Sequence, residues 1–408
     1  MWIPFIWIAL AASRPLTSWL TPGVATAENF ESALLQGNSA ERNYMIILLV
    51  AGALLLLKRR DRITFYFKDN VYIYLLYFYA LVSIVWSAYP GISAKRYIRL
   101  VGDIIMALLI LSEDRENNAL DHILRRCAIF LIPMSMLFVR FLTQYGIGYS
   151  RDGFRTWTGV TTNKNSLGML CAFLGTYLIW RILKNWPRFN YVDSALLLMT
   201  LYLLWGSRST TSLLVLLMGT ALLILGGVFR GQTKKMNRWV LALLLFFGIM
   251  LVFGGSSFFS VFLKITAKDS SFTGRIPLWT DLLQIGIRNP LTGSGYASFW
   301  PSHAALMWRK YNFLPIQSHN GYIDVFLDLG LAGFALLLYW IIQTYRNILK
   351  DFERKLETSR LMLAFFIMVI FHNIMESTLI KPFNLLWMIF LLSSIVMVRK
   401  PESAESSL

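Results

Sequence analysis

Charged residues are scarce in this sequence. Only 15% of its 408 residues are charged, whereas a soluble domain carries roughly 25%. Hydrophobic residues make up 56% of the chain, and the mean hydropathy is +0.54. So few charges cannot cover a water-facing surface of this size, which excludes a soluble enzyme, a disordered chain and a nucleic-acid-binding domain. Because lipid-facing surface needs no charge, the composition indicates an integral membrane protein.

Motifs that hold metals, nucleotides or disulfides are also missing. The two cysteines, Cys127 and Cys171, lie in or beside apolar segments, which argues against a disulfide framework. The sequence has no Cys/His cluster with metal-ligand spacing, no P-loop lysine and no Gly-x-Gly-x-x-Gly motif. We therefore expect neither a metal nor another cofactor.

Apolar runs are what the sequence has instead, and a membrane span needs about 20 such residues. The runs predict twelve spans, at residues 2–13, 43–57, 71–87, 97–112, 124–142, 165–183, 192–206, 211–229, 238–254, 320–344, 361–377 and 382–398. The first run is short, but further apolar segments follow it, so it reads as a span and not as a cleavable signal. Arg99 and Asp103 lie within the fourth span at a spacing that would let them pair on a helix.

The net charge of +17 comes from basic clusters between the apolar runs, which is typical of loops in polytopic membrane proteins. Four clusters fall on one side of the predicted topology: 58–62, 230–238, 346–360 and 399–400. By the positive-inside rule this side is the cytoplasm, and both termini are then cytoplasmic. The charge is thus explained by membrane topology, without nucleic acid as a partner.

The predicted spans divide the chain into four parts: a bundle at 1–254, an external loop at 255–319, three spans at 320–398 and a cytoplasmic tail at 399–408. The loop between spans nine and ten is the large one. Within it, Thr273 can cap a helix, Pro277 suits a first turn, and Asn289-Pro290 ends the pattern. Apolar residues at helical spacing in between predict an amphipathic helix on the membrane face, part of a structured lid.

Three residues on the predicted outer side are candidates for chemistry. Arg208 lies in a tight turn between two spans, where it is either an anchor at the headgroups or an anion clamp, since arginine presents a planar fork suited to phosphate. Arg275 opens the loop helix, where the helix dipole already favours anions; its alternative role is a solvated charge. His319 stands where the loop re-enters the membrane and could accept a proton at neutral pH, although a lone histidine is more often structural.

Other polar residues could support these three. His372 and Glu376, four residues apart in the eleventh span, are a rival base or a supporting pair on one helical face, and interhelical hydrogen bonding is the alternative. Asp324 and Asp328 have the same spacing in the tenth span, where carboxylates are functional by default or pair with a neighbouring arginine. Outer arginines, a histidine and a lid together indicate an anionic substrate handled at the outer surface. A lipid-linked diphosphate sugar would fit, because it supplies its own leaving group.

Several motifs resemble the O-antigen ligase and Wzy-type polymerase superfamily. They are Gly274-Arg275-Ile276-Pro277-Leu278-Trp279, Asn289-Pro290-Leu291-Thr292-Gly293-Ser294-Gly295, Ser318-His319-Asn320-Gly321-Tyr322 and Gly206-Ser207-Arg208-Ser209. The stretch from Gly159 to Gly168 and the early Ala12-Ser13-Arg14-Pro15 are similar to the ExoQ-like exopolysaccharide polymerase branch. The resemblance covers residues 140–345 best.

This resemblance implies a mostly helical GT-C-type glycosyltransferase of about twelve transmembrane helices in the bacterial inner membrane, with its active site on the periplasmic side. Its substrates would be undecaprenyl-diphosphate-linked glycans, used without a metal or a nucleotide sugar, and a glycan or lipid acceptor. By motif, Arg208 and Arg275 would bind diphosphate and His319 would be the catalytic base. Arg155, Lys164 and Asn165 match only the general pattern of the preceding outer loop.

Four readings remain open. The first is a polysaccharide polymerase, which the short external loop favours, working beside export and chain-length proteins. The second is a ligase that moves the finished glycan onto lipid A core or another acceptor. The third is a flippase for lipid-linked glycans, which would predict an internal repeat and broken helices at mid-membrane. The fourth is a scaffold in an export complex.

Overall fold

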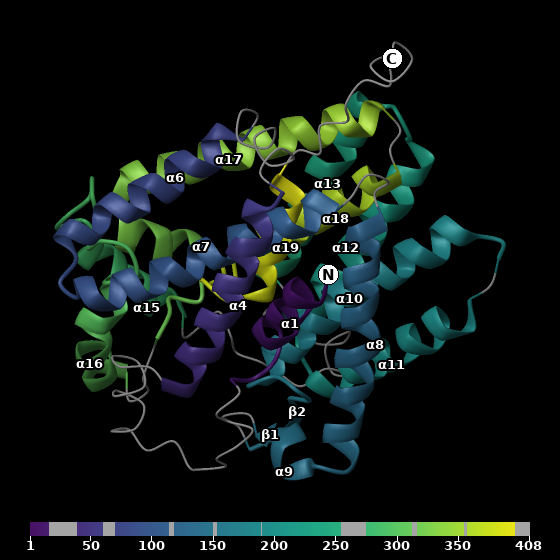
Figure 1. Cartoon of the computed structure of the whole chain (residues 1–408), viewed down its shortest axis with the longest axis horizontal. Coiled ribbons are helices and arrows are strands. Elements are labelled where there is room, and N and C mark those ends of the chain that lie inside the picture. Colours follow the sequence, from purple (N-terminus) through teal and green to yellow (C-terminus); the bar gives the residue numbers. More distant parts are fainter. Residues whose placement is uncertain are drawn as a thin grey trace.

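A computed structural model of the chain describes residues 1–15, 39–59, 70–113, 118–149, 153–188, 190–253, 275–311, 316–354 and 357–395. These residues form helices that pack side by side, with one small hairpin at one end of the bundle (Figure 1). The expectation of a mostly helical protein is therefore confirmed.

Each of the twelve predicted spans overlaps a helix, and the third overlaps two. In chain order these are α1 (Trp2–Ala11), α4 (Ser39–Leu57), α6 (Val71–Val82) with η1 (Ser83–Trp86), α7 (Pro90–Glu113), α8 (Asn118–Arg140), α10 (Lys164–Asn185), α11 (Tyr191–Ser207), α12 (Thr210–Val228), α13 (Thr233–Phe253), α17 (Gly321–Glu353), α18 (Glu357–His372) and α19 (Leu385–Ser394). Within the described residues, four helical stretches are long and apolar enough to cross a membrane: Ala119–Arg140, Lys164–Asn185, Thr210–Val228 and Gly321–Glu353. The count of twelve spans stays a prediction.

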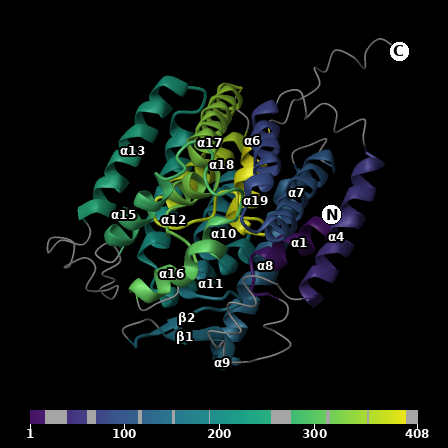
Figure 2. The same cartoon turned by 90° about the vertical axis from the view of Figure 1, so that its left-hand side faces the viewer.

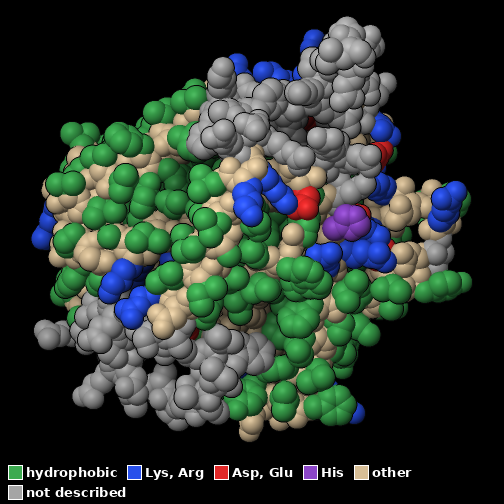
Figure 3. Space-filling view, viewed as in Figure 1, with side chains coloured by type: hydrophobic (Ala, Val, Ile, Leu, Met, Phe, Trp, Pro, Cys, Tyr) green, Lys and Arg blue, Asp and Glu red, His purple; other side chains and the backbone are tan. Residues whose placement is uncertain are grey.

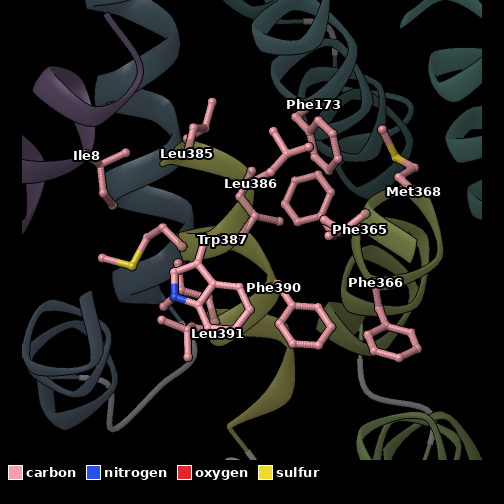
Figure 4. Close-up of a cluster of buried hydrophobic side chains, with 14 of the residues drawn as sticks. Ile8, Phe173, Phe365, Phe366, Met368, Leu385, Leu386, Trp387, Phe390 and Leu391 are labelled. Carbon is pink, nitrogen blue, oxygen red and sulfur yellow. The ribbon is translucent and has the colours of Figure 1, made fainter. Parts of the chain in front are cut away.

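The core gathers around α19. All ten residues of this helix are buried, as expected of a helix that is apolar on every side. Its Trp387 lies among aromatic and aliphatic side chains from α10, α18 and α1, such as Phe173, Phe365 and Ile8 (Figure 4). The Trp387 ring centroid lies 5.3 Å from that of Trp340 in α17, in an edge-to-face contact.

The surface of the bundle is rich in apolar side chains. Hydrophobic residues cover much of one broad face, with basic side chains gathered in a few groups (Figure 3). Large hydrophobic residues on α8, α11 and α13 are exposed, among them Leu137, Trp205 and Leu241. Exposed apolar area on this scale is unusual for a soluble monomer, and it is what a bilayer would cover.

A break in α17 shapes the region of the predicted lid. Gly330 has φ +64 and ψ −166, which interrupts the helix. The backbone groups that the break leaves without helical partners form hydrogen bonds to the segment that follows α15. Leu331 N donates to Pro290 O at 2.8 Å, and Ser294 N donates to Leu327 O at 3.0 Å. A Cβ at Gly330 would lie 2.4 Å from the carbonyl carbon of Leu291. The Asn-Pro-Leu-Thr-Gly-Ser-Gly motif therefore replaces the hydrogen bonds that the broken helix gives up.

The large loop contains the helix that the sequence predicts. The structure places α15 at Arg275–Gly286 and adds α16 at Phe299–Tyr311. An apolar cluster that includes Leu278, Trp300 and Leu327 packs α15 and α16 against the first part of α17. The predicted cap Thr273 and the first part of the loop, 255–274, lie outside the described residues.

One sequence expectation needs correction. Asp103 does not pair with Arg99: its buried carboxylate accepts from Trp7 Nε1 at 2.8 Å and from Phe383 N at 3.0 Å, since those donors reach it inside the bundle. The segment between α8 and α10 contains the short helix α9 (Thr143–Gly146) and an antiparallel hairpin of β1 (Ile147–Tyr149) and β2 (Arg155–Trp157), which the sequence did not predict. Figure 2 shows this hairpin at one end of the bundle, beside α9.

Candidate active site

A histidine and a carboxylate meet where α17 begins and α18 ends. His319 Nδ1 lies 3.0 Å from Glu376 Oε2. The His319 side chain is 30% exposed and that of Glu376 is 11% exposed. A carboxylate that accepts from Nδ1–H favours the tautomer in which Nε2 carries the lone pair. The arrangement can therefore hold an imidazole ready to accept a proton.

Local backbone geometry places both side chains. His319 has φ +55, an unfavourable conformation for a residue with a side chain, and is followed by Asn320, which caps α17 by accepting from Tyr322 N and Ile323 N. Gly321 N then donates to Asn373 O at 2.8 Å and to Glu376 O at 3.1 Å. Strained residues persist where their surroundings hold them. The close approach of Gly321 explains the glycine of the His-Asn-Gly motif, because a Cβ there would lie 2.2 Å from Asn373 Oδ1.

Glu376 gathers further side chains from distant parts of the chain. Its Oε1 accepts from Asn165 Nδ2 at 2.9 Å, and Arg275 NH2 lies 3.5 Å from the same oxygen. Arg275 also donates to Met375 O. The sequence proposed Arg275, His319 and Asn165 as separate site residues. The structure joins all three through one carboxylate.

Gln317 and Lys381 complete this group, and the sequence analysis missed both. Gln317 Nε2 lies 3.3 Å from His319 Nδ1 and 3.4 Å from Glu376 Oε2, and its Oε1 accepts from Lys381 Nζ at 3.1 Å. Lys381 also forms an ion pair with Asp324 at 2.9 Å. A lysine in the short connection between the last two predicted spans was the available signal, since a charge so close to apolar helices needs a partner.

Arg208 lies in a neighbouring turn. It ends α11 in the left-handed conformation, with φ +52, and is exposed. Its guanidinium lies 5.9 Å from the ring centroid of Phe154. Within the described ranges no hydrogen bond or ion pair joins it to His319 or Glu376. The turn nevertheless packs near the site, because a Cβ at Gly168, three residues after Asn165 on α10, would lie 2.7 Å from the Cβ of Ser209.

The remaining predicted residues have different surroundings. Arg155 is exposed on β2, where its backbone pairs with Tyr149. Lys164 is the first residue of α10, next to Asn165, and is half-buried. α18 ends at His372, and Glu376 N donates to His372 O at 3.0 Å in the turn that follows. Within the described residues no hydrogen bond or ion pair joins the two side chains, because the Glu376 carboxylate bonds to His319 and Asn165. His372 is 1% exposed, beneath the site.

Arg14 has a role that the sequence did not assign. It donates to Gly159 O at 3.1 Å and to Thr161 O at 2.8 Å, and its backbone N donates to Val160 O at 2.9 Å. These bonds fix the turn that leads into Asn163, the N-cap of α10. Arg14 therefore helps to hold the start of α10, where Asn165 projects toward Glu376.

An ion pair connects the two helices of the external segment. Lys310 Nζ lies 2.6 Å from Asp281 Oδ2, and Tyr311 donates to the same oxygen. The lysine and then the tyrosine lower the pKa of Asp281, while burial and the nearby carboxylate raise the pKa of Tyr311 to about 12. In addition, Trp279 Nε1 donates to Ser318 O at 2.8 Å, so α15 contacts the residue before His319 directly.

Comparison with known proteins gives two matches. Residues 194–338 match the O-antigen ligase family. The chain is also 26% identical over 301 residues to the exopolysaccharide production protein ExoQ of Rhizobium meliloti (strain 1021). This match covers 70% of the chain and 66% of the relative, just under two thirds of its length. The O-antigen ligase match contains Arg208, Arg275 and His319, and it ends before Glu376 and Lys381. The matches confirm the resemblance drawn from the sequence motifs.

Proposed function

Since the chain belongs to the O-antigen ligase and ExoQ-like family, we propose that it is a membrane glycosyltransferase that polymerises undecaprenyl-diphosphate-linked repeat units into a surface polysaccharide. The contact between His319 and Glu376, with Arg275 and Asn165 on the same carboxylate, carries this proposal. We place the reaction at the periplasmic face of the bacterial inner membrane, because these residues lie at the end of the bundle that the charge pattern predicts to face outward.

The chemistry is one displacement at the anomeric carbon of the donor sugar. His319 Nε2 takes the proton of an acceptor hydroxyl while that oxygen forms the new glycosidic bond. The bond from the anomeric carbon to the diphosphate breaks, and the lipid diphosphate leaves with the electron pair. Arg275 and Arg208 would stabilise the charge on the leaving group, as preorganised cations do in a transition state. The displacement inverts the configuration at the sugar.

Purified protein in nanodiscs, given an undecaprenyl-diphosphate-linked repeat unit, tests the proposal. The wild type should release undecaprenyl diphosphate and form longer glycans. His319→Ala should lose transfer by a factor of about 10² to 10⁴, the usual contribution of a general base, and still bind the donor. His303→Ala is the matched control, because this loop histidine stacks on Phe299 at 4.4 Å and should be dispensable. Unimpaired transfer by His319→Ala would remove the base from the proposal.

A ligase is the second candidate, favoured by the family description of residues 194–338. It would use the same donor and move the finished glycan to lipid A core or another acceptor. Deletion of the gene separates the two activities. Loss of a polymerase leaves single repeat units on the carrier lipid, whereas loss of a ligase leaves long chains that are never delivered.

The break at Gly330 in α17 is a feature that a flippase for lipid-linked glycans would also show. In this protein, however, the break is filled by hydrogen bonds from residues 290–294. It therefore has a structural cause that requires no transport pathway. Donor turnover by the purified protein would exclude both a flippase without catalysis and a scaffold.

A further inference from the structure

Asp324 is a buried carboxylate with four donors. Its side chain is 5% exposed and lies in the first turn of α17. Oδ1 accepts from Ser318 N at 3.0 Å and from Trp300 Nε1 at 3.1 Å. Oδ2 accepts from Ser377 Oγ and from Lys381 Nζ, the latter at 2.9 Å. A carboxylate in this position is stable only because both oxygens are fully bonded.

Two of these donors are sequence neighbours of His319 and Glu376, the pair that we call the dyad. Ser318 directly precedes His319, and Ser377 directly follows Glu376. The dyad residues themselves are 57 positions apart and come from different segments. Asp324 therefore binds both segments at the positions next to the reacting pair, which sets how closely His319 and Glu376 approach each other.

A second connection from Asp324 runs through Lys381. Lys381 pairs with Asp324 and donates to Gln317 Oε1. With its oxygen bonded to the lysine, the Gln317 amide turns its NH₂ group toward Glu376 Oε2, at 3.4 Å. Its nitrogen also lies 3.3 Å from His319 Nδ1, which is a contact between two donors and not a hydrogen bond while Nδ1 carries the proton. The charge of Asp324 thus fixes Lys381, and Lys381 fixes the side chain that contacts both members of the dyad.

We propose that Asp324 is the positioning residue of the His319–Glu376 pair: it contacts neither substrate nor base but holds the two segments in the geometry that proton transfer needs. This inference rests on the proposed function. It differs from a general role in folding, because the bonds converge on the residues adjacent to the dyad.

Asp324→Asn tests the inference, since it keeps the size of the side chain and removes the charge that holds Lys381. A misplacement of about 1 Å can cost about 10²-fold in rate, so kcat for glycan transfer should fall by up to this factor. KM for the lipid-linked donor should stay nearly unchanged, because donor contacts are retained. Asp328→Asn is the matched control: Asp328 lies one turn further along α17 and accepts from Phe299 N at 3.0 Å, and within the described residues no side-chain hydrogen bond or ion pair joins it to the segments of His319 and Glu376, so kcat should be retained.

Two further measurements keep the test decisive. Ser377→Ala removes one tether without changing any charge, and a smaller loss of kcat at unchanged KM is expected even if Asp324→Asn folds poorly. Nitrogen NMR of ¹⁵N-histidine-labelled protein, with His319→Ala to assign the signal, should show an Nδ1-protonated ring in the wild type and a changed tautomer ratio in Asp324→Asn.

The outcomes separate this inference from the proposed function. A wild type that turns over no lipid-diphosphate donor overturns the function, and the inference with it. A wild type that is active, with Asp324→Asn matching Asp328→Asn in kcat and an unchanged His319 tautomer, overturns the inference alone. Equal losses in both aspartate variants would show that Asp324 serves only the stability of α17.

Discussion

His319 Nδ1 and Glu376 Oε2 lie 3.0 Å apart, although 57 positions separate the two residues in the chain. The histidine comes from the segment that enters α17, and the carboxylate comes from the turn after α18. Hydrolases and transferases commonly orient a catalytic histidine with an acid in this way, because the acid fixes the tautomer and stabilises the imidazolium that forms. Glu376 therefore has a distinct role from the one expected of it as a partner of His372.

Glu376→Gln should lower kcat for glycan transfer by about 10²-fold or more, because an amide NH₂ facing Nδ1 favours the wrong tautomer of His319. The effect should vanish in the background of His319→Ala, where no base is left to orient. The measurement compares the initial rates of Glu376→Gln, His319→Ala and the double variant. Glu357→Gln is a suitable control, since Glu357 pairs with Arg230 and Arg360 at the other end of α18. Independent, multiplying losses in the double variant would contradict the pairing.

Much of this architecture could be predicted from local pattern. Each apolar run that predicts a span overlaps a helix of the structure. The positions of Thr273, Pro277 and Asn289-Pro290 predicted a helix where α15 lies. These features depend on residues close in sequence. The hairpin β1–β2 was missed because three-residue strands carry too little alternation to be recognised.

The composition of the site could be predicted only in part, because it depends on contacts between distant segments. His319 and Arg275 stand out by residue type and by position at the ends of predicted elements. The partners of Asp103 and Asp324 could not be predicted from spacing along one helix, since both carboxylates bond to other segments: Asp103 to Trp7 and Phe383, and Asp324 to Lys381 among others. A carboxylate within an apolar segment predicts that a partner exists, but the sequence does not identify that partner.

Arg275→Lys should fail to restore the activity that Arg275→Ala loses. The guanidinium reaches Met375 O with one nitrogen and approaches Glu376 Oε1 at 3.5 Å with the other, which a single ammonium group cannot do in the same geometry. We expect kcat/KM of the lysine variant to stay at least about tenfold below the wild type, a loss of about 1.4 kcal/mol in transition-state binding. Full activity of the lysine variant in the same transfer assay would show that only charge is needed at this position.

Arg208→Gly distinguishes the role of the Arg208 side chain from the role of its backbone conformation in the α11–α12 turn. Arg208 has φ +52, which glycine adopts freely, so this variant should keep the turn and the thermal stability of the protein. If the guanidinium binds diphosphate, KM for the lipid-linked donor should rise at least several-fold in Arg208→Gly. Arg208→Ala should show the same rise together with a lower melting temperature. A glycine variant with normal KM would assign Arg208 to anchoring at the headgroups, as its contact with Phe154 allows.

The contact between α15 and α16 should weaken in acid. The pKa of Asp281 is lowered in the folded protein by Lys310 and Tyr311, so this contact stabilises the segment above the ordinary pKa of an aspartate and is lost as the pH falls through the lowered value. Hydrogen exchange of residues 299–311 should therefore be slower at neutral pH than in acid, after correction for intrinsic rates. Asp281→Asn should remove this difference. An equal pH dependence in the variant would show that another group controls the segment.

Gly330→Ala should destabilise the protein, because the break in α17 leaves no room for a side chain. The added Cβ would lie 2.4 Å from the carbonyl carbon of Leu291, and φ +64 is unfavourable for alanine. A single residue forced into such a conformation costs about 1–3 kcal/mol, and the backbone contact adds to this cost. Thermal unfolding in detergent measures the effect. Gly248→Ala in α13 is the control, since among the described residues no atom outside its own turn of helix lies within 4 Å of the added Cβ, and alanine favours a helix by up to about 1 kcal/mol. A Gly330→Ala protein as stable as the wild type would contradict the close packing of residues 290–294 against the break in α17. It would equally contradict the hydrogen bonds that we describe there.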